Sequence, residues 1–224
     1  MKLQLSEMCS LNRRSMGLAL GAVLALAGLN PTAQAVNLVQ NGGFETYDSG
    51  AANSGGTGYL TYLAGNAGIS NWTVGPSGGS VDIVIPPQSS YIYAGNAALD
   101  LVGSPGPGSV EQTLATTNGA THTVTFRAQW RQDALNRTID VSLGSETQQV
   151  VLGAAQATWE LVTLNFTNVA GSSNVFKLAS LTNNTTNGNT MIDEVSVVAN
   201  PVPEPFTLAL AAGALAAAAR RRKR

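Results

Sequence analysis

The chain has 224 residues with 12 basic and 13 acidic side chains, a formal net charge of −1 at pH 7, and one cysteine, Cys9. A single cysteine excludes a disulfide framework and a cysteine-rich zinc cluster. Between residues 36 and 200 only 4 side chains are basic and 11 are acidic, which argues against nucleic acid and anionic lipid as partners.

The first 35 residues have the pattern of a secretory signal peptide. Arg13-Arg14 precede an apolar stretch at residues 16–29, and Ala33 and Ala35 form an A-x-A cleavage pattern. We therefore expect residues 1–35 to direct export and to be cut off after Ala35. Cys9 leaves with this segment.

Residues 36–200 are long enough for one domain with a packed core, and their pattern is all-β. Residues 48–68 are rich in Gly and Asn, which predicts a long loop. The clearest strand covers residues 122–131, where apolar and polar residues alternate. One face carries Val124, Phe126, Ala128 and Trp130, and the other carries Thr125, Arg127, Gln129 and Arg131.

Further strands are expected at 80–85, 97–102, 109–114, 139–143, 148–152, 160–168, 174–180 and 191–198. Turn-forming clusters of Gly, Pro, Asn and Thr separate several of these strands. Many short strands without a helical pattern indicate a two-sheet β-sandwich of the jelly-roll type.

The C-terminal segment, residues 201–224, has three parts. Val202, Pro203, Glu204, Pro205 and Thr207 come first, followed by the apolar residues 206–219 and the basic residues 220–224. A 14-residue helix spans about 21 Å, which is short for a hydrocarbon core of about 30 Å.

This order of parts resembles the PEP-CTERM sorting signal of Gram-negative bacteria. The resemblance implies export through the inner membrane, transient residence there as a transmembrane sorting helix, and cleavage by an exosortase near Pro205. The protein would then reach the cell surface or the extracellular space.

Short motifs in the middle of the chain form a second pattern. They are Asn41-Gly42-Gly43-Phe44-Glu45, Ile69-Ser70-Asn71-Trp72, Val81-Asp82-Ile83-Val84, Ala98-Leu99-Asp100-Leu101 and Met191-Ile192-Asp193-Glu194. In this order they resemble the choice-of-anchor C family of bacterial surface proteins and plant cell-wall proteins with galactose-binding-like domains. The resemblance implies a jelly roll and, by analogy, association with polysaccharide.

The resemblance also implies a structural calcium ion held by Glu45 and Asp193, because the first and last strands meet in related carbohydrate-binding jelly rolls. The alternative is that Glu45 pairs with a cation or caps backbone amides, while Asp193 and Glu194 are charges on an edge strand.

No pattern of residues indicates catalysis. The single histidine, His122, stands at the start of a predicted strand, where we expect it on the surface, and no nucleophile elbow accompanies it. The acidic residues are scattered singly, which gives no pair for glycoside hydrolysis. We therefore expect no enzyme.

Binding of sugar is the favoured function. Tyr91 and Tyr93 follow a double proline, and Arg127, Gln129 and Arg131 share the polar face of the best strand. Aromatic rings and bidentate arginine contacts suit sugars, including uronic acids. Trp72 and Trp130 fit core positions instead. The alternatives are a solvated polar face on a structural or adhesive surface protein without a sugar site and, less favoured, a glycan-acting enzyme.

Overall fold

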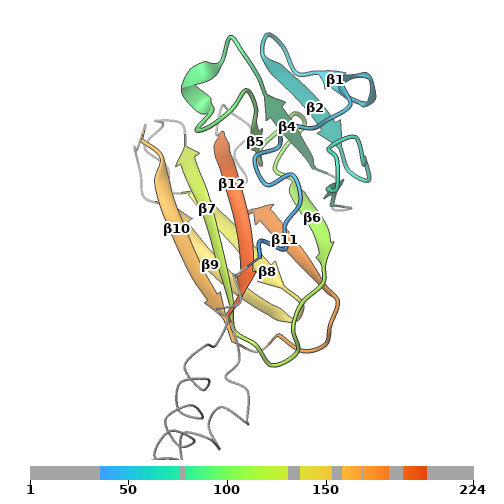
Figure 1. Ribbon diagram of the computed structural model, residues 1–224. Helices are drawn as coiled ribbons and strands as arrows, with labels where there is room; N and C mark the ends of the chain where they lie inside the picture. Colours follow the sequence, from blue (N-terminus) through green and yellow to red (C-terminus); the bar gives the residue numbers. More distant parts are fainter. Residues whose placement is uncertain are drawn as a thin grey trace, which may run out of the picture. The chain divides into compact units, whose positions relative to one another are not determined.

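In a computed structural model of the chain, two antiparallel β-sheets pack face to face around one hydrophobic core (Figure 1). The structure describes residues 36–75, 79–130, 137–152, 158–167, 169–181 and 189–200. The expected signal peptide, the sorting segment and Arg131 lie outside these residues. None of the helices formed by the described residues has the length and apolar character needed to cross a bilayer.

The larger sheet has seven strands, and its first four run from one edge to the middle. They are β1 (Asn53–Ser54), β2 (Tyr59–Leu63), β4 (Ser80–Val84) and β5 (Ala98–Asp100). The order continues with β12 (Thr190–Ala199), β7 (His122–Trp130) and β10 (Glu160–Phe166).

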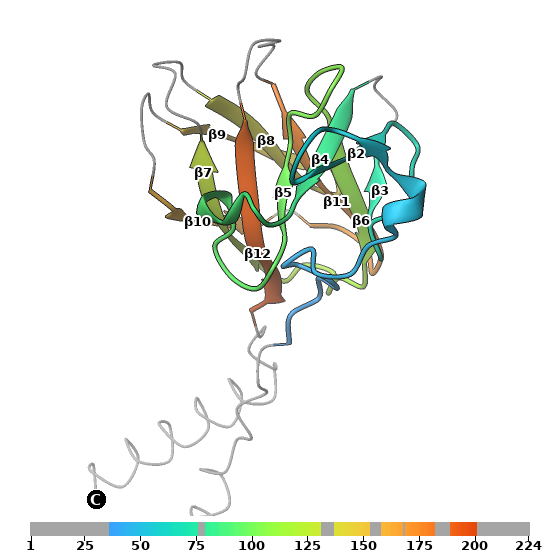
Figure 2. The ribbon, with the colours of Figure 1, turned by 90° about the horizontal axis from the view of Figure 1, so that it is seen from above.

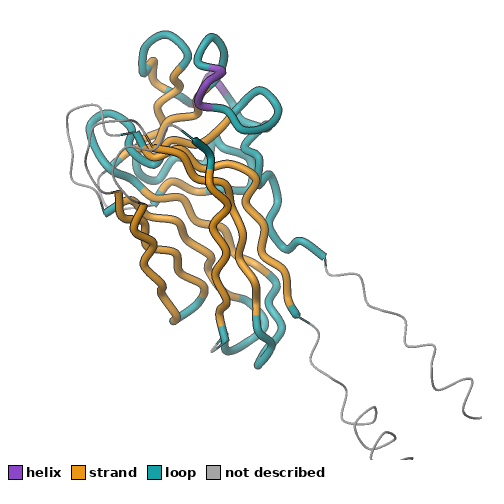
Figure 3. The backbone as a smooth tube through the Cα atoms, turned by 90° about the vertical axis from the view of Figure 1, so that its left-hand side faces the viewer, coloured by secondary structure: helices purple, strands orange, loops and turns teal. Residues whose placement is uncertain are grey.

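The smaller sheet has five strands. Their order is β3 (Thr73–Val74), β6 (Ser109–Leu114), β11 (Asn174–Ser180), β8 (Arg137–Leu143) and β9 (Glu146–Leu152). Helical backbone is confined to two short 3₁₀ turns, η1 (Ser49–Ala51) and η2 (Ser89–Tyr91), while strands and loops form the rest of the described chain (Figure 3). The prediction of an all-β, two-sheet sandwich is thus confirmed.

The alternation in the sequence decides which side chains face the core. In β7, Val124, Phe126, Ala128 and Trp130 are buried between the sheets, as the sequence predicts. Trp72 is buried beside the same core, so both tryptophans occupy the expected core positions. The opposite surface of the seven-stranded sheet, which points away from the core, is called the outer face below.

The prediction of a long loop at residues 48–68 is wrong in part. This stretch contains η1, β1 and the whole of β2, which pairs in register with β4. Tyr62 in β2 is fully buried, and its hydroxyl donates to the carbonyl of Asp48 at 3.0 Å. The surrounding glycines and asparagines form the turns, and they obscure a strand of only five residues.

The N-terminal segment, residues 37–45, closes one side of the sandwich. Leu38 N donates to Val197 O at 2.8 Å, and Val195 N donates to Gly42 O at 2.9 Å, so the segment runs beside β12. Phe44 is fully buried, with its ring centroid 5.5 Å from that of Trp72. Opposite Gly42, the pairing of β12 with β7 shifts between Asp193 and Ser196, which marks a β-bulge.

A substitution at Gly42 tests whether the N-terminal segment packs tightly against β12. A Cβ atom at Gly42 would lie 2.1 Å from Val195 O, a backbone atom that has no freedom to move aside. We expect Gly42→Ala to lower the free energy of unfolding by about 1–3 kcal/mol, as overpacking does. Urea unfolding followed by tryptophan fluorescence measures this change.

Gly43→Ala is the matched control. The nearest atom to a Cβ at Gly43 is Glu194 Oε1 at 3.5 Å, an ordinary contact, so its stability should be close to that of the wild type. Equal stability of the two variants would contradict the tight closure.

Candidate functional site

The connection between β4 and β5, residues 85–97, crosses the outer face in front of β7 and β12 (Figure 2). Its backbone is held there by an acidic side chain of β12. Tyr93 N and Ala94 N each donate to Asp193 Oδ2 at 3.0 Å, and Glu194 N donates to Asp193 Oδ1 at 2.7 Å. Asp193 therefore fixes the position of this connection over the sheet.

A second carboxylate holds the end of the same connection. Asn96 N donates to both oxygens of Glu45, at 2.9 and 3.1 Å, and Ala97 N donates to Oε1 at 3.2 Å. Asp193 is fully buried, and this burial raises its pKa to about 6, although the amide hydrogen bonds oppose the rise. Glu45 and Asp193 thus bind the same connection from two sides.

Three side chains meet where this connection passes β7. The guanidinium carbon of Arg127 lies 4.6 Å from the centroid of the Tyr93 ring. The Tyr93 ring also contacts Trp159 edge-on, with centroids 5.7 Å apart and an angle of 62° between the planes. We call Tyr93, Arg127 and Trp159 the Tyr93 cluster. It brings together a cation and two aromatic rings from three separate parts of the chain.

The Tyr93 cluster remains accessible. Tyr93 is 43% exposed, and Leu161, which is the cross-strand partner of Arg127, is 56% exposed. Thr125 and Thr163 follow as a cross-strand pair on the same face, since side chains two positions apart point the same way. An apolar and hydroxyl-bearing surface therefore extends from the cluster along β7 and β10.

The structure brings together two of the five residues chosen from the sequence for sugar binding, Tyr93 and Arg127. Tyr91 ends the 3₁₀ turn η2 and is half-buried. Gln129 lies two positions from Arg127 but is buried, and Arg131 is outside the described residues.

Trp159 was not chosen from the sequence. It directly precedes β10, whose first residue pairs with Ala128 of β7. The sequence could have indicated this position only if the antiparallel register between the strands predicted at 122–131 and 160–168 had been known.

The expectation of a surface histidine is wrong. His122 is fully buried at the start of β7. Thr117 N donates to its Nε2 at 3.3 Å, and its Nδ1 lies 3.1 Å from Ala120 O. Both ring nitrogens stabilise the turn before β7, and the ring faces no open site.

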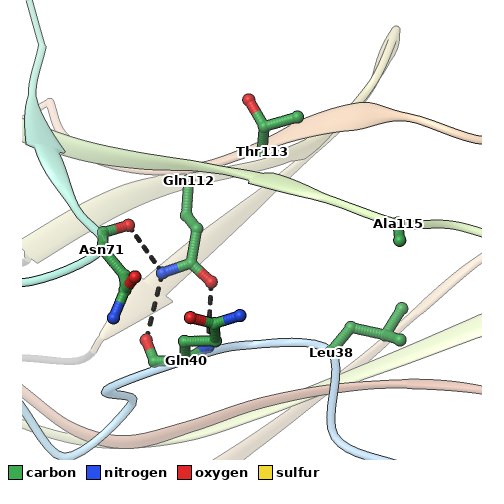
Figure 4. A pocket seen from close by; sticks show the side chains of 6 residues that line it. All are labelled: Leu38, Gln40, Asn71, Gln112, Thr113 and Ala115. Carbon is green, nitrogen blue, oxygen red and sulfur yellow. Dashed lines mark hydrogen bonds between the residues drawn. The ribbon is translucent and has the colours of Figure 1, made fainter.

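A pocket of about 320 Å³ opens where the N-terminal segment meets β6 (Figure 4). The Gln112 amide joins the two: its Nε2 donates to Gln40 O at 3.0 Å and to Asn71 O at 2.8 Å, and its Oε1 accepts from Gln40 N at 2.9 Å. Leu38, Thr113 and Ala115 complete the lining. Since both amide hydrogens of Gln112 are donated and its oxygen accepts from Gln40 N, the side chain ties the N-terminal segment to β6.

The model of a family described as "Protein of unknown function (DUF642)" matches residues 37–198, which include all the strands described above except the last residue of β12. The chain belongs to the DUF642 family. No curated protein matches this DUF642 chain.

Solved structures share the fold of this DUF642 domain. The TmCBM61 carbohydrate-binding module in complex with β-1,4-galactotriose is 15% identical, with a TM-score of 0.51 over 74% of this chain and 99% of the module. A cyclase from Fischerella sp. TAU is 14% identical, with a TM-score of 0.51 over 75% of this chain and 99% of the cyclase.

The arabinose-bound MgGH51 α-L-arabinofuranosidase is 13% identical, with a TM-score of 0.50 over 76% of this chain and 27% of the enzyme. At these identities the similarity shows the fold alone, and that fold occurs in both binding modules and enzymes.

The geometry of this DUF642 domain does not fit a calcium ion at Glu45 and Asp193. Backbone amides already donate to the oxygens of both carboxylates, and they point positive charge where a cation would lie. Among the described residues, no three His, Cys, Asp or Glu side chains are grouped to hold a metal. The alternative of edge-strand charges is wrong for Asp193, because β12 is an interior strand.

A chelator experiment tests the calcium prediction. Because amides satisfy both carboxylates, we expect the melting temperature of the DUF642 domain to stay the same when excess EDTA replaces calcium in the buffer. Differential scanning fluorimetry measures it, with Glu45→Gln as the comparison. A lower melting temperature in EDTA for the wild type, but not for Glu45→Gln, would restore calcium to this site.

Proposed function

We propose that this DUF642 domain is a non-catalytic carbohydrate-binding module whose Tyr93 cluster contacts the ligand. The observation that carries the proposal is the contact of Tyr93 with both Arg127 and Trp159 on an accessible part of the outer face. Aromatic faces stack on the apolar faces of sugar rings, while guanidinium and hydroxyl groups bind the sugar oxygens. The fold shared with the TmCBM61 module supports this function.

The ligand is an extracellular polysaccharide. Tyr93 and Leu161 offer an apolar surface for the rings, and Thr125 and Thr163 offer hydroxyl groups further along the same face. Arg127 is one of only 4 basic side chains between residues 36 and 200, and its fork suits the carboxylate of a uronic acid. A neutral galactan would use the same rings without this ion pair.

Binding to soluble polysaccharides tests the proposal. We expect Tyr93→Ala and Trp159→Ala each to weaken binding roughly tenfold or more, because removing a stacked ring at the centre of a site costs about 1.4 kcal/mol or more. Affinity electrophoresis over a panel with neutral galactans and uronic-acid polymers measures this change.

Arg127→Ala should weaken binding to the uronic-acid polymers more than to the galactans, and high salt should reduce that difference. Lys177→Ala is the matched control, since Lys177 lies on β11 in the other sheet. A folded wild-type protein that binds no polymer would favour a purely structural or adhesive surface protein.

We also infer that the chain is exported and processed at both ends. The motifs at residues 1–35 and 201–224 support this, and a domain without cysteine between residues 36 and 200 does not depend on a disulfide for folding. An exosortase would cut near Pro205, so that the domain reaches the cell surface or extracellular matrix.

Mass spectrometry of the protein recovered from its native host tests this processing. The expected N-terminus is Val36, and the expected C-terminus lies beside the Pro203-Glu204-Pro205 motif, without the basic residues 220–224. Glu204→Ala should leave the C-terminal segment attached. Recovery of an intact residue 224 from the wild type would contradict exosortase processing.

A further inference from the structure

Two acidic side chains lie side by side on neighbouring interior strands of the seven-stranded sheet. Asp82 of β4 and Asp100 of β5 are cross-strand partners, and both are buried, with 7% and 0% exposure. Their strands carry two of the motifs noted in the sequence, and the proposed sugar site uses neither residue. Burial of two like charges side by side is unfavourable unless something neutralises them.

The turn formed by residues 102–108 covers this pair. Gly103 N donates to Ser80 O at 3.0 Å, and Ser80 N donates to Gly106 O at 3.1 Å. A Cβ atom at Gly103 would lie 2.9 Å from Asp82 Oδ1, so the turn lies directly against that carboxylate. The 102–108 turn therefore packs against Asp82, and its first residue, Val102, donates to Asp100.

The two carboxylates have different surroundings. Val102 N and Thr190 N each donate to Asp100 Oδ1 at 2.9 Å, and the Asn189 amide donates to Oδ2. Asp82 is in register with Thr61 of β2, whose hydroxyl lowers the Asp82 pKa, but among the described residues Asp82 Oδ1 is buried without a hydrogen-bond partner that meets normal geometry. Asp82 is thus the less compensated member of the pair.

Within the described residues, the elements packed against the pair carry no basic side chain. In the described residues, β2, β4, β5, β12 and the 102–108 turn contain no Lys, Arg or His. The other ionisable side chains of these elements near the pair are Tyr59 of β2 and Asp193 of β12. Tyr59 is two positions from Thr61, which is in register with Asp82, and Asp193 is two positions from Met191, which is in register with Asp100. Neither supplies a positive charge.

We propose that Asp82 and Asp100 share a proton and act as a pH-dependent latch for the 102–108 turn. While the proton is present, the pair carries at most one negative charge and the turn can stay closed over it. When the proton is lost, two buried charges repel each other. The pair gains most by exposing one carboxylate to water, which requires the turn to lift from β4.

The raised pKa values of the two carboxyl groups agree with this geometry. Burial raises the pKa of Asp82 to about 6 and that of Asp100 to about 7, and the charge of Asp82 contributes to the rise at Asp100. Because the two groups interact, both values belong to the pair and not to one residue each.

A proton fits the site better than a metal ion. Calcium takes about 6–8 oxygen ligands and usually keeps water among them. Here two carboxylates and one hydroxyl are enclosed with almost no exposure, and Asn189 directs its amide hydrogens at Asp100. A proton needs no such shell.

The sign of the pH dependence follows from the raised pKa values. In the unfolded chain both carboxylates ionise near pH 4, whereas in the folded protein they hold the proton to about pH 6 and 7. The stability that the pair supplies is therefore complete below about pH 4 and is lost as the pH rises to about 7. A carboxylate whose pKa is two units higher in the folded state changes the unfolding constant by roughly 100-fold.

Thermal unfolding of the purified protein between pH 4 and pH 8 tests the latch. We expect the melting temperature to fall with rising pH in the wild type, and to fall much less in the double variant Asp82→Asn/Asp100→Asn. Asparagine imitates the protonated acid, so the double variant should be the more stable protein at pH 8.

Asp140→Asn is the matched control, because Asp140 lies half-exposed on β8 in the other sheet. Its pH profile should parallel that of the wild type. Equal slopes for the wild type and the double variant would overturn the proposal.

NMR of the wild type tests the pair without a substitution, in case the double variant does not fold. The amide resonances of Val102 and Thr190, which donate to Asp100, should titrate together with midpoints between about pH 6 and 7. Amide exchange at Gly103, corrected for its intrinsic pH dependence, should increase over the same interval. Midpoints near pH 4 would overturn the proposal.

Calcium supplies the last comparison. If calcium at pH 8 raised the melting temperature of the wild type and not that of the double variant, the pair would hold a cation in place of a proton, and the proposal would fail. An equal response of both proteins to calcium supports the proton.

Discussion

The close contact between the N-terminal segment and the bulge of β12 is the constraint on which the rest of the structure depends. Gly42 lies against the backbone of Val195 because it has no side chain, and Phe44 then enters the core beside Trp72. The beginning of β12 pairs with β5 through Met191 and Ile192, whereas the part from Val195 to Val197 pairs with the N-terminal segment. A segment distant in sequence thereby completes the sheet and shields the core from water.

The same contact sets up the candidate binding surface. When Phe44 is buried, Glu45 emerges beside Asp193, and the two carboxylates hold the backbone of the connection between β4 and β5. Tyr93 is then fixed above Arg127 instead of moving with a free loop. Preorganisation of this kind lowers the entropy lost on binding. The site is therefore a consequence of how the sandwich is closed.

Much of the fold could be predicted from the sequence, because alternation is a local property. The strand with Val124, Phe126 and Ala128 has the expected faces, and the two-sheet sandwich follows from many such strands. The burial of His122 and the position of Trp159 could not be predicted in the same way, since both depend on pairing between distant strands. His122 is in register with Phe166 of β10 and Ala199 of β12, and β10 begins opposite Ala128. For the same reason Tyr93 and Arg127 could be named as candidates, but their contact could not.

The central position of β12 also has a mechanical consequence. This last strand is hydrogen-bonded on both sides, to β7 along one edge and to β5 and the N-terminal segment along the other. A force applied to the chain beyond residue 200 and directed along β12 would load these bonds together in shear, whereas an edge strand pulled sideways opens one bond at a time. Forced unfolding depends on the height of the unfolding barrier, and shear loading keeps that barrier high. The strand that positions Asp193 is thus suited to bear tension.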